Sequence, residues 1–220
     1  MKERIEVFLE QFRQPVPGYI SELERYAWEN DVPVIRRGTR DLLRYLLRTK
    51  CPQKVLEVGT AIGYSSLFMK ECLPETSRIT TVEKVEMRLV EARKNLAVYD
   101  PEGHIRLLEG DAADILQRLV ESGETYDFIF MDAAKGQYLN FLPSVLQLMT
   151  PGSVLVSDNI FHEGDVLESR YAVCRRDRTI HGRMREYLKV ITNHEQLETI
   201  CLPIGDGMTL STFVQKGENQ

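Results

Sequence analysis

Apolar residues recur at helical spacing near the start of the chain. The recurring positions are Ile5, Phe8, Leu9 and Phe12, followed by Leu42, Leu43, Leu46 and Leu47. Because residues three and four apart share one face of a helix, this spacing predicts amphipathic helices. Pro15, Pro17 and Pro33 interrupt the pattern and are expected to separate these helices. The pattern therefore predicts an N-terminal helical cap over residues 1–50.

After Pro52 the pattern changes to short β-rich runs that are separated by amphipathic helical segments. The runs are Lys54–Val58, Arg78–Val82, His104–Leu108, Asp127–Met131 and Val154–Ser157. Strands that alternate with helices are typical of a parallel sheet with helices on both faces. We therefore expect a Rossmann-like, doubly wound α/β core over residues 51–220.

The sequence of the last third of the chain predicts that the sheet ends in antiparallel strands. An arginine-rich loop precedes a predicted helix near Ile180–Asn193, and two strands follow, Leu197–Leu202 and Met208–Gln215. Gly205-Asp206-Gly207 between these strands is a hairpin turn signal. An antiparallel pair is thus expected to complete a mostly parallel, seven-stranded sheet. Because the sequence shows no linker or internal repeat, residues 1–220 are interpreted as one domain.

The composition excludes several classes of protein. The chain has 220 residues, of which 43% are hydrophobic, enough for one core. No apolar run approaches the roughly 18 residues of a membrane helix, and Met1–Glu10 lacks the apolar stretch of a signal peptide, so we expect a soluble, cytoplasmic protein without a membrane partner. The four cysteines have no CxxC pair and suggest neither a zinc site nor a disulfide framework.

The charge of the chain is unevenly distributed. A formal net charge of −5 argues against a non-specific nucleic-acid binder. The basic residues nevertheless gather in two clusters, one at Arg36, Arg37, Arg40, Arg44, Arg48 and Lys50, and one at Arg170, Arg175, Arg176, Arg178, Arg183 and Arg185. A local basic surface, or simply a solvated face, is compatible with this clustering.

Two glycines follow the first predicted strand, within Val55–Ser65. Gly59 and Gly63 are spaced as GxxxG, whereas a dinucleotide-binding loop prefers GxGxxG, whose middle glycine lets the backbone approach a pyrophosphate. Glu57 suits a ligand with an ammonium group and no phosphate. Glu83 ends the second strand, where a carboxylate can accept both ribose hydroxyls. Together these features predict S-adenosylmethionine binding, with a plain strand-to-helix turn as the alternative.

Oxygen-bearing side chains end two further strands. Asp132 follows the fourth strand, and Asp158 and Asn159 follow the fifth, at the edge where ligands bind in this architecture. Two carboxylates and an amide, with no His or Cys nearby in sequence, suit Mg²⁺, Ca²⁺ or Mn²⁺. Helix capping or turn formation is the alternative use of such residues. Lys135 beside such a cation is a candidate general base.

These motifs resemble the metal-dependent catechol and caffeoyl-CoA type O-methyltransferases, and the resemblance runs from about Val32 onward. It is carried by Glu57–Ser65, Glu83, Met131–Lys135, Ser157–Asn159 and Pro203–Leu210. It implies an S-adenosylmethionine donor and Mg²⁺, or another hard divalent cation, held by Asp132, Asp158 and Asn159. The implied donor-binding residues are Glu57, Gly59, Gly63, Tyr64, Ser65, Glu83, Asp111, Ala112 and Asp132. Lys135 and Asp132 are the implied catalytic residues.

Within this family, the run Asp132–Tyr138 and the basic loop after Asn159 most resemble the bacterial tRNA 5-hydroxyuridine methyltransferases. These enzymes make 5-methoxyuridine at the anticodon wobble position, and family members in bacteria are commonly dimers. The resemblance therefore implies a homodimer that acts on tRNA. The candidate RNA-binding residues are Arg175, Arg176, Arg178, Arg36 and Arg37.

Three other functions remain open at this point. The first is methylation of catechol-like small molecules, since a catechol and the O5 and C4 carbonyl oxygens of 5-hydroxyuridine can chelate a metal in the same way. The second is an RNA-binding module without catalysis, against which the intact set around Asp132 and Lys135 argues. The third is a nicotinamide-dependent oxidoreductase, which the GxxxG spacing disfavours.

Overall fold

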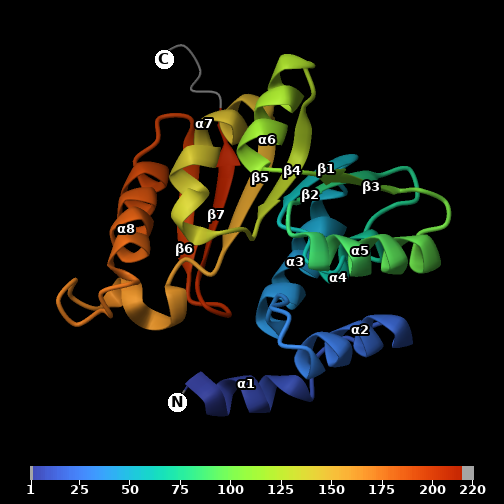
Figure 1. Ribbon diagram of the computed structural model, residues 1–220, viewed down its shortest axis with the longest axis horizontal. Coiled ribbons are helices and arrows are strands. Elements are labelled where there is room, and N and C mark those ends of the chain that lie inside the picture. Colours follow the sequence, from blue (N-terminus) through green and yellow to red (C-terminus); the bar gives the residue numbers. More distant parts are fainter. Residues whose placement is uncertain (1, 215–220) are drawn as a thin grey trace.

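A computed structural model describes residues 2–214 of the chain, and its centre is a seven-stranded sheet (Figure 1). The strands lie in the order β3-β2-β1-β4-β5-β7-β6. They are β1 (Lys54–Val58), β2 (Arg78–Glu83), β3 (Ile105–Glu109), β4 (Tyr126–Met131), β5 (Met149–Asp158), β6 (Leu197–Leu202) and β7 (Met208–Phe213).

Neighbouring strands from β3 to β5 pair in parallel, whereas β7 runs antiparallel to both β5 and β6. The predicted fold class, with its closing hairpin, is confirmed. The chain winds outward from β1 to β3 and then returns to β4 on the other side of β1. A crevice opens at such a reversal, beyond the carboxyl ends of the two strands, and this is where α/β sheets bind ligands.

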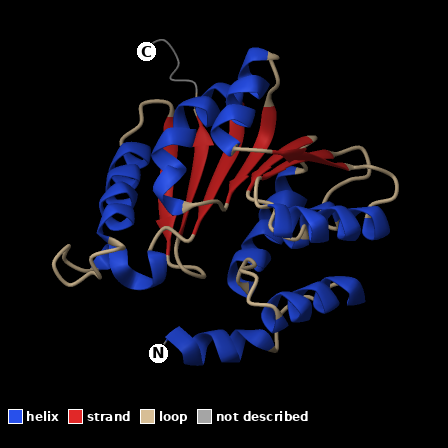
Figure 2. Cartoon of the chain, in the orientation of Figure 1, coloured by secondary structure: helices blue, strands red, loops and turns tan. Residues whose placement is uncertain are grey.

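Helices cover both faces of the sheet (Figure 2). The helices are α1 (Lys2–Glu10), α2 (Gly18–Glu29), α3 (Arg37–Lys50), α4 (Tyr64–Lys70), α5 (Glu86–Tyr99), α6 (Ala112–Glu121), α7 (Tyr138–Leu148) and α8 (Arg178–Thr192). Two short 3₁₀ helices, η1 (Lys135–Gln137) and η2 (His162–Leu167), follow β4 and β5.

Alternation along each strand divides the core into two layers. Val55 and Phe130 face a cluster with side chains of α2, α3 and α4, such as Leu43 and Phe68. The next residues, Leu56 and Met131, face the opposite cluster, which α6, α7 and α8 supply. Because successive strand residues point to opposite faces, each strand of the centre needs apolar residues throughout. The sheet is therefore packed against helices on both faces, which holds the carboxyl ends of its strands in place.

The helical cap has the predicted breaks. α2 begins directly after Pro17, and the segment between α2 and α3 contains Pro33. None of the described helices is both long and apolar enough to cross a membrane.

The boundaries of β2, β3 and β4 differ from the prediction by one residue, and those of β5 and β7 differ by more. β5 begins at Met149, before Pro151 and Gly152, rather than at Val154. Proline and glycine are uncommon inside strands, but here the register to β4 shifts between Tyr126 and Phe128 and accommodates them as an irregularity. β7 ends at Phe213, and the predicted end at Gln215 lies outside the described residues.

Candidate active site

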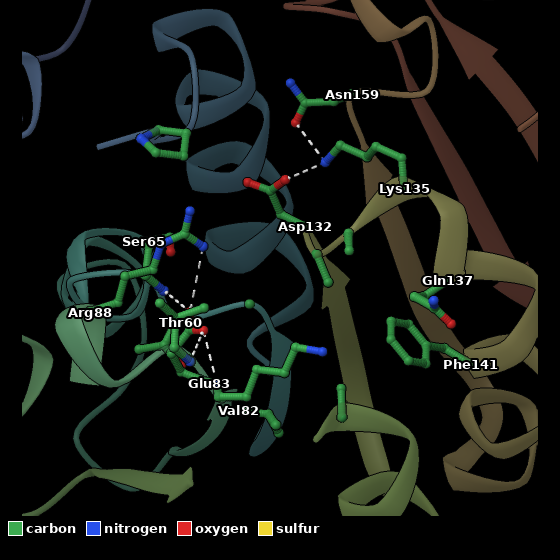
Figure 3. Close-up of a pocket in the computed structure, with 18 of the residues that line it drawn as sticks. Thr60, Ser65, Val82, Glu83, Arg88, Asp132, Lys135, Gln137, Phe141 and Asn159 are labelled. Atoms are coloured by element: carbon green, nitrogen blue, oxygen red, sulfur yellow. Dashed lines mark hydrogen bonds and ion pairs between the residues drawn. The ribbon is translucent and has the colours of Figure 1, made fainter. Parts of the chain in front are cut away.

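A cavity of about 530 Å³ opens at the carboxyl ends of β1, β2 and β4 (Figure 3). Its lining includes eight of the residues predicted for donor or metal binding, namely Gly59, Tyr64, Ser65, Glu83, Asp111, Ala112, Asp132 and Asn159, together with Lys135. Glu57, Gly63 and Asp158 are not part of the lining. The segments that follow β1, β2, β3, β4 and β5 therefore converge on one space, as the sequence predicted.

The loop after β1 has a backbone that few residues can adopt. Gly59 and Gly63 have φ values of 109° and 85°, and Ala61, at 48°, is also left-handed. Such a conformation costs a non-glycine residue free energy, and its presence in a cavity wall indicates a functional constraint. The N–H groups of Gly59 and Thr60 donate to the Val82 carbonyl, both at 3.1 Å, so β2 holds the loop in place.

The carboxylate of Glu83 is fixed by backbone donors. One oxygen accepts the N–H of Ala61 at 2.9 Å, and the other accepts the N–H groups of Lys84 and Val85, each at 2.9 Å. The guanidinium of Arg88 lies 4.0 Å away. A carboxylate has about four lone-pair sites, so it can still accept a hydroxyl from the cavity. Glu83 is thus preorganised as an acceptor at this end of the site.

Glu57 lies below the loop rather than in the cavity. Its side chain is fully buried and accepts hydrogen bonds from the hydroxyls of Ser66 and, at 2.6 Å, Thr81, which in turn contacts Thr60 at 2.6 Å. Burial raises the pKa of Glu57 to about 7. The sequence suggested direct contact with an ammonium group, but the structure places this carboxyl among the hydroxyls that support the loop.

Asp111 begins the wall on the side of β3. Its carboxylate caps α6 by accepting the N–H of Ala113 at 3.0 Å, and Lys84 lies 3.1 Å from it. Backbone capping, followed by the bond from Lys84, lowers the pKa of Asp111. Ala112 follows it in the lining, with Phe141 of α7 also in the wall. Ala112 and Phe141 thus supply apolar surface beside the capped carboxylate of Asp111.

Three side chains meet at the other end of the cavity (Figure 3). The ammonium of Lys135 donates to Asp132 at 2.7 Å and to the amide oxygen of Asn159 at 3.2 Å. Asp132 and Asn159 are both half-buried, and they follow the neighbouring strands β4 and β5 directly. One cation of the chain therefore already lies between the oxygens that were predicted to hold a metal.

Asp158 lies deeper than Asp132. One oxygen accepts the Asn159 N–H at 2.9 Å and the Thr39 hydroxyl at 3.3 Å, while the other is buried without a hydrogen-bond partner among the described residues. Burial, and after it the charge of Asp132, raises the pKa of Asp158 to about 7. The next residue, Asn159, has a φ of 54°, which turns its side chain away from the line of β5.

The residues at this corner fit a hard divalent cation. Within residues 2–214 no three or more His, Cys, Asp or Glu side chains gather as a metal cluster. The predicted set has two carboxylates and one amide, so only two of its three members belong to these four residue types. All three groups are oxygen donors, and the unpartnered oxygen of Asp158 needs a cation or a hydrogen-bond donor. A site of this kind keeps coordination positions open for substrate oxygens.

Comparison with known proteins assigns the chain to a family. The profile of the O-methyltransferase family matches residues 16–214. The chain belongs to the O-methyltransferase family. A catechol O-methyltransferase of Niastella koreensis is 33% identical over 172 residues, which are 76% of each chain. A caffeoyl-CoA O-methyltransferase of Populus trichocarpa is 31% identical over 76% of this chain and 70% of its own. The prediction of an S-adenosylmethionine-dependent O-methyltransferase is thereby confirmed at the level of the family.

Solved structures agree with this assignment. A Staphylococcus aureus protein assigned to the caffeoyl-CoA O-methyltransferases superposes with a TM-score of 0.85 at 29% identity, over 96% of this methyltransferase and 98% of that chain. A Streptomyces achromogenes O-methyltransferase of tomaymycin synthesis, solved with S-adenosylmethionine, gives 0.82 at 24% identity, over 96% of both chains. The second likeness shows the fold alone.

Within the two predicted basic clusters, some arginines are paired and others are exposed. Arg37 of the methyltransferase pairs with Glu10 and, at 2.9 Å, with Glu24, and is engaged within the cap. Arg36 is exposed directly after the segment 33–35, which lines the cavity. In the second cluster Arg175 and Arg176 are exposed, and Arg176 lies 3.2 Å from Asp177.

Arg183 and Arg185 have backbone partners. Arg183 donates to the Gly136 carbonyl at 2.5 Å, which joins α8 to η1, and Arg185 donates to the Glu168 carbonyl at 3.2 Å. Gly136 stands between Lys135 and Gln137, both in the cavity wall. α8, which follows the exposed Arg175 and Arg176, is thus attached to the segment that carries Lys135.

Several site residues gave no signal in the sequence. Thr39 reaches Asp158 across 119 positions, and Ala61 holds Glu83 through its backbone. Tyr138 belongs to the motif Asp132–Tyr138, but no role was predicted for it. Its hydroxyl lies close to the ends of β4 and β5, beside Asp132 and Asp158. Only the packing of distant segments brings these groups together.

Proposed function

We propose that this methyltransferase uses S-adenosylmethionine and a hard divalent cation to methylate the 5-hydroxyl of 5-hydroxyuridine at the wobble position of tRNA. One observation carries the proposal. The cavity has a fixed carboxylate, Glu83, at one end, and Lys135 among hard oxygens at the other. The first suits the ribose of the donor, and the second suits an acceptor hydroxyl that must lose its proton.

Donor binding is assigned to the loops after β1, β2 and β3. We assign Glu83 to the ribose hydroxyls and the wall at Asp111 and Ala112 to the adenine. Gly59, Tyr64 and Ser65 border the space for the methionine part of the donor. Glu57 and Gly63 act indirectly, since one supports the loop from below and the other starts α4 in a left-handed conformation.

The acceptor end is assigned to Asp132, Asp158 and Asn159 as holders of the cation. When bound, such a cation attracts the acceptor oxygen and makes its proton easier to lose. Lys135, in its neutral amine form, is the group that we assign to receive this proton, because its Nζ lies beside two of these residues, at 2.7 Å from Asp132 and 3.2 Å from Asn159. The methyl group then passes from the donor sulfur to the acceptor oxygen.

The basic segment before α8 supports an RNA acceptor. Arg175 and Arg176 lie on the chain just ahead of α8, Arg178 begins this helix, and Arg183 attaches it to Gly136. These arginines can bind phosphates near the acceptor end. A catechol-like small molecule is the second candidate, since the Niastella koreensis relative is a catechol O-methyltransferase. Both acceptors present two neighbouring oxygens.

Mass spectrometry of tRNA nucleosides distinguishes these acceptors. We expect a deletion strain to accumulate 5-hydroxyuridine and to lack 5-methoxyuridine. The purified protein should restore the methylated nucleoside in that tRNA when it is supplied with donor and Mg²⁺. Unchanged nucleosides, together with turnover of catechol by the purified protein, would instead establish the small-molecule acceptor.

We also propose that the methyltransferase is a homodimer. α1 and the turn after it leave apolar side chains in solvent, with Val7, Phe8 and Phe12 exposed to 72%, 60% and 63%. Ion pairs of Glu10 with Arg13 and Arg37 connect its end to the rest of the cap. A second copy can cover this apolar helix. Sedimentation equilibrium of the wild type and of Phe8→Glu tests this, and a monomeric wild type would contradict it.

A further inference from the structure

Tyr138 connects the two strand ends that carry the candidate metal ligands. Its side chain is fully buried at the start of α7. The hydroxyl lies 3.0 Å from the carbonyl oxygen of Met131 and 3.0 Å from that of Asp158. A phenol has one proton, so it donates to one of these carbonyls at a time and shares it between them. The hydroxyl therefore joins β4 and β5 at the point where each strand ends.

This hydroxyl lies just beyond the hydrogen-bonded part of β4 and β5. Met131 and Ser157 form the last registered pair of β4 and β5, so the regular ladder stops just before Asp132 and Asp158. Buried carbonyl groups beyond a ladder need another donor. Tyr138 supplies it, and it thereby fixes how far apart the two strands stand where the two carboxylates begin.

The same oxygen also accepts a hydrogen bond from Lys135. The amine of Lys135 lies 3.2 Å from the Tyr138 hydroxyl and 5.4 Å from the centre of its ring. An ammonium has three donors, and those of Lys135 are matched by Asp132, Asn159 and Tyr138. Of these three partners, Tyr138 is the one that is not assigned to the cation. It can therefore keep the amine in place when a cation occupies the two others.

We propose that the Tyr138 hydroxyl is a positioning group that sets the spacing of Asp132 and Asp158 and holds the Lys135 amine beside the acceptor. This inference rests on the proposed function for the roles of these three residues. It adds a fourth residue, which touches neither donor nor acceptor and acts through the others.

Tyr187 offers a matched control. Its ring packs edge-on against that of Tyr138, with centroids 5.3 Å apart and planes at 76°, and it is equally buried. Its hydroxyl contacts the Ser157 hydroxyl at 2.6 Å and no group of the cavity wall. Tyr138→Phe and Tyr187→Phe each remove one buried phenol oxygen from the same pair of rings. A purely structural effect should therefore appear in both variants.

The test measures Mn²⁺ affinity by calorimetry, S-adenosylhomocysteine affinity and thermal unfolding for the wild type and both variants. We expect Tyr138→Phe to weaken Mn²⁺ binding by about 10- to 100-fold, which is typical when a partner of a metal ligand is lost. Donor-product affinity should stay within twofold, and the melting temperatures of both variants should fall similarly. An Mn²⁺ affinity of Tyr138→Phe within twofold of that of Tyr187→Phe would overturn the proposed spacing role.

A second readout follows Lys135 without any metal. Trace acetylation, quantified by mass spectrometry with exposed Lys189 as the internal reference, reports how freely the Lys135 amine reacts. We expect at least a threefold higher relative rate in Tyr138→Phe and no change in Tyr187→Phe. Equal rates in all three proteins would overturn the role toward Lys135. If the wild type binds no Mn²⁺, the cation assignment of the proposed function fails, while this rate still decides the inference.

Discussion

The backbone of Gly59 lies directly against the carbonyl group of Asp132. A Cβ atom added to Gly59 would stand 2.8 Å from the carbonyl carbon of Asp132 and closer still to its oxygen. The φ of 109° at Gly59 is also a conformation that L side chains rarely adopt. The loop after β1 and the first residue beyond β4 therefore touch without side chains between them, which joins the donor end of the cavity to the acceptor end.

Gly59→Ala should harm both stability and donor binding. The new methyl group would meet backbone, which cannot rotate away, so we expect a loss of about 2–4 kcal/mol in the free energy of unfolding. S-adenosylhomocysteine affinity should fall at least tenfold. Gly152→Ala is the control, since Gly152 has a φ of 83° with nothing within 4 Å of an added Cβ. It should lose about 1–2 kcal/mol from backbone strain and keep donor affinity. Equal donor affinities in the two variants would contradict this account.

Glu57 should make stability depend on pH around neutrality. Its pKa is about 7 in the folded protein and 4.5 ordinarily, so between these values the folded state holds a proton that the unfolded chain has lost. The contribution of Glu57 to stability is therefore largest below about pH 4.5, falls as pH rises from 4.5 through 7 and is constant above that. The difference between the two pKa values corresponds to roughly 3 kcal/mol.

Glu57→Gln should remove this pH dependence, because an amide can still accept from Ser66 and Thr81 without becoming charged. Urea unfolding at pH 5, 6, 7 and 8 measures the effect. The stability of the variant relative to the wild type should increase from pH 5 to about pH 7 and level off above it. Parallel pH profiles for the two proteins would show that Glu57 does not titrate in this range.

Features that depend on neighbours in sequence could be predicted from the sequence. The end of a strand, a glycine spacing and an acid after a strand are local, so Gly59, Glu83, Asp132 and Asp158 were all placed at one edge. The mostly parallel, doubly wound sheet followed from the alternation of strands with helices, and its antiparallel end followed from the hairpin signal between the last two strands. The cavity lining accordingly contains most of the predicted residues.

Features that depend on packing between distant segments could not be predicted. Thr39 reaches Asp158 only because α3 packs against the sheet, and Arg37 pairs with Glu24 through the arrangement of the cap. Glu57 points below its loop because strand residues alternate between faces, and the sheet and α4 together decide which face is buried. The sequence pattern shows that a residue is polar, but not which partner it finds.

Asp158→Asn should abolish cation-dependent turnover while the fold survives. The amide removes one of two negative charges near the proposed cation, so we expect activity to fall by more than about 100-fold. Excess EDTA should likewise stop the wild type, and added Mg²⁺ should restore it. Asp127→Asn is the control, because Asp127 accepts the backbone N–H groups of Gln53 and Lys54 at the far end of β4. Full turnover of Asp158→Asn, or of the wild type in EDTA, would refute the cation site.

The arginines before α8 should carry tRNA binding if the acceptor is tRNA. Each phosphate contact releases counterions, so replacing Arg175, Arg176 and Arg178 together with Ala should make the salt dependence of tRNA binding shallower by about two to three units of logarithmic slope. S-adenosylmethionine affinity should not change, because the donor loops lie elsewhere.

Arg37→Ala is the control for this triple variant. Its guanidinium already pairs with Glu24 and Glu10, so its loss should lower stability and leave the salt slope unchanged. Filter binding over a salt series measures both slopes. A triple variant with an unaltered slope and Michaelis constant for tRNA would show that this segment does not bind the RNA, and Arg36 at the cavity mouth would then be the next residue to replace.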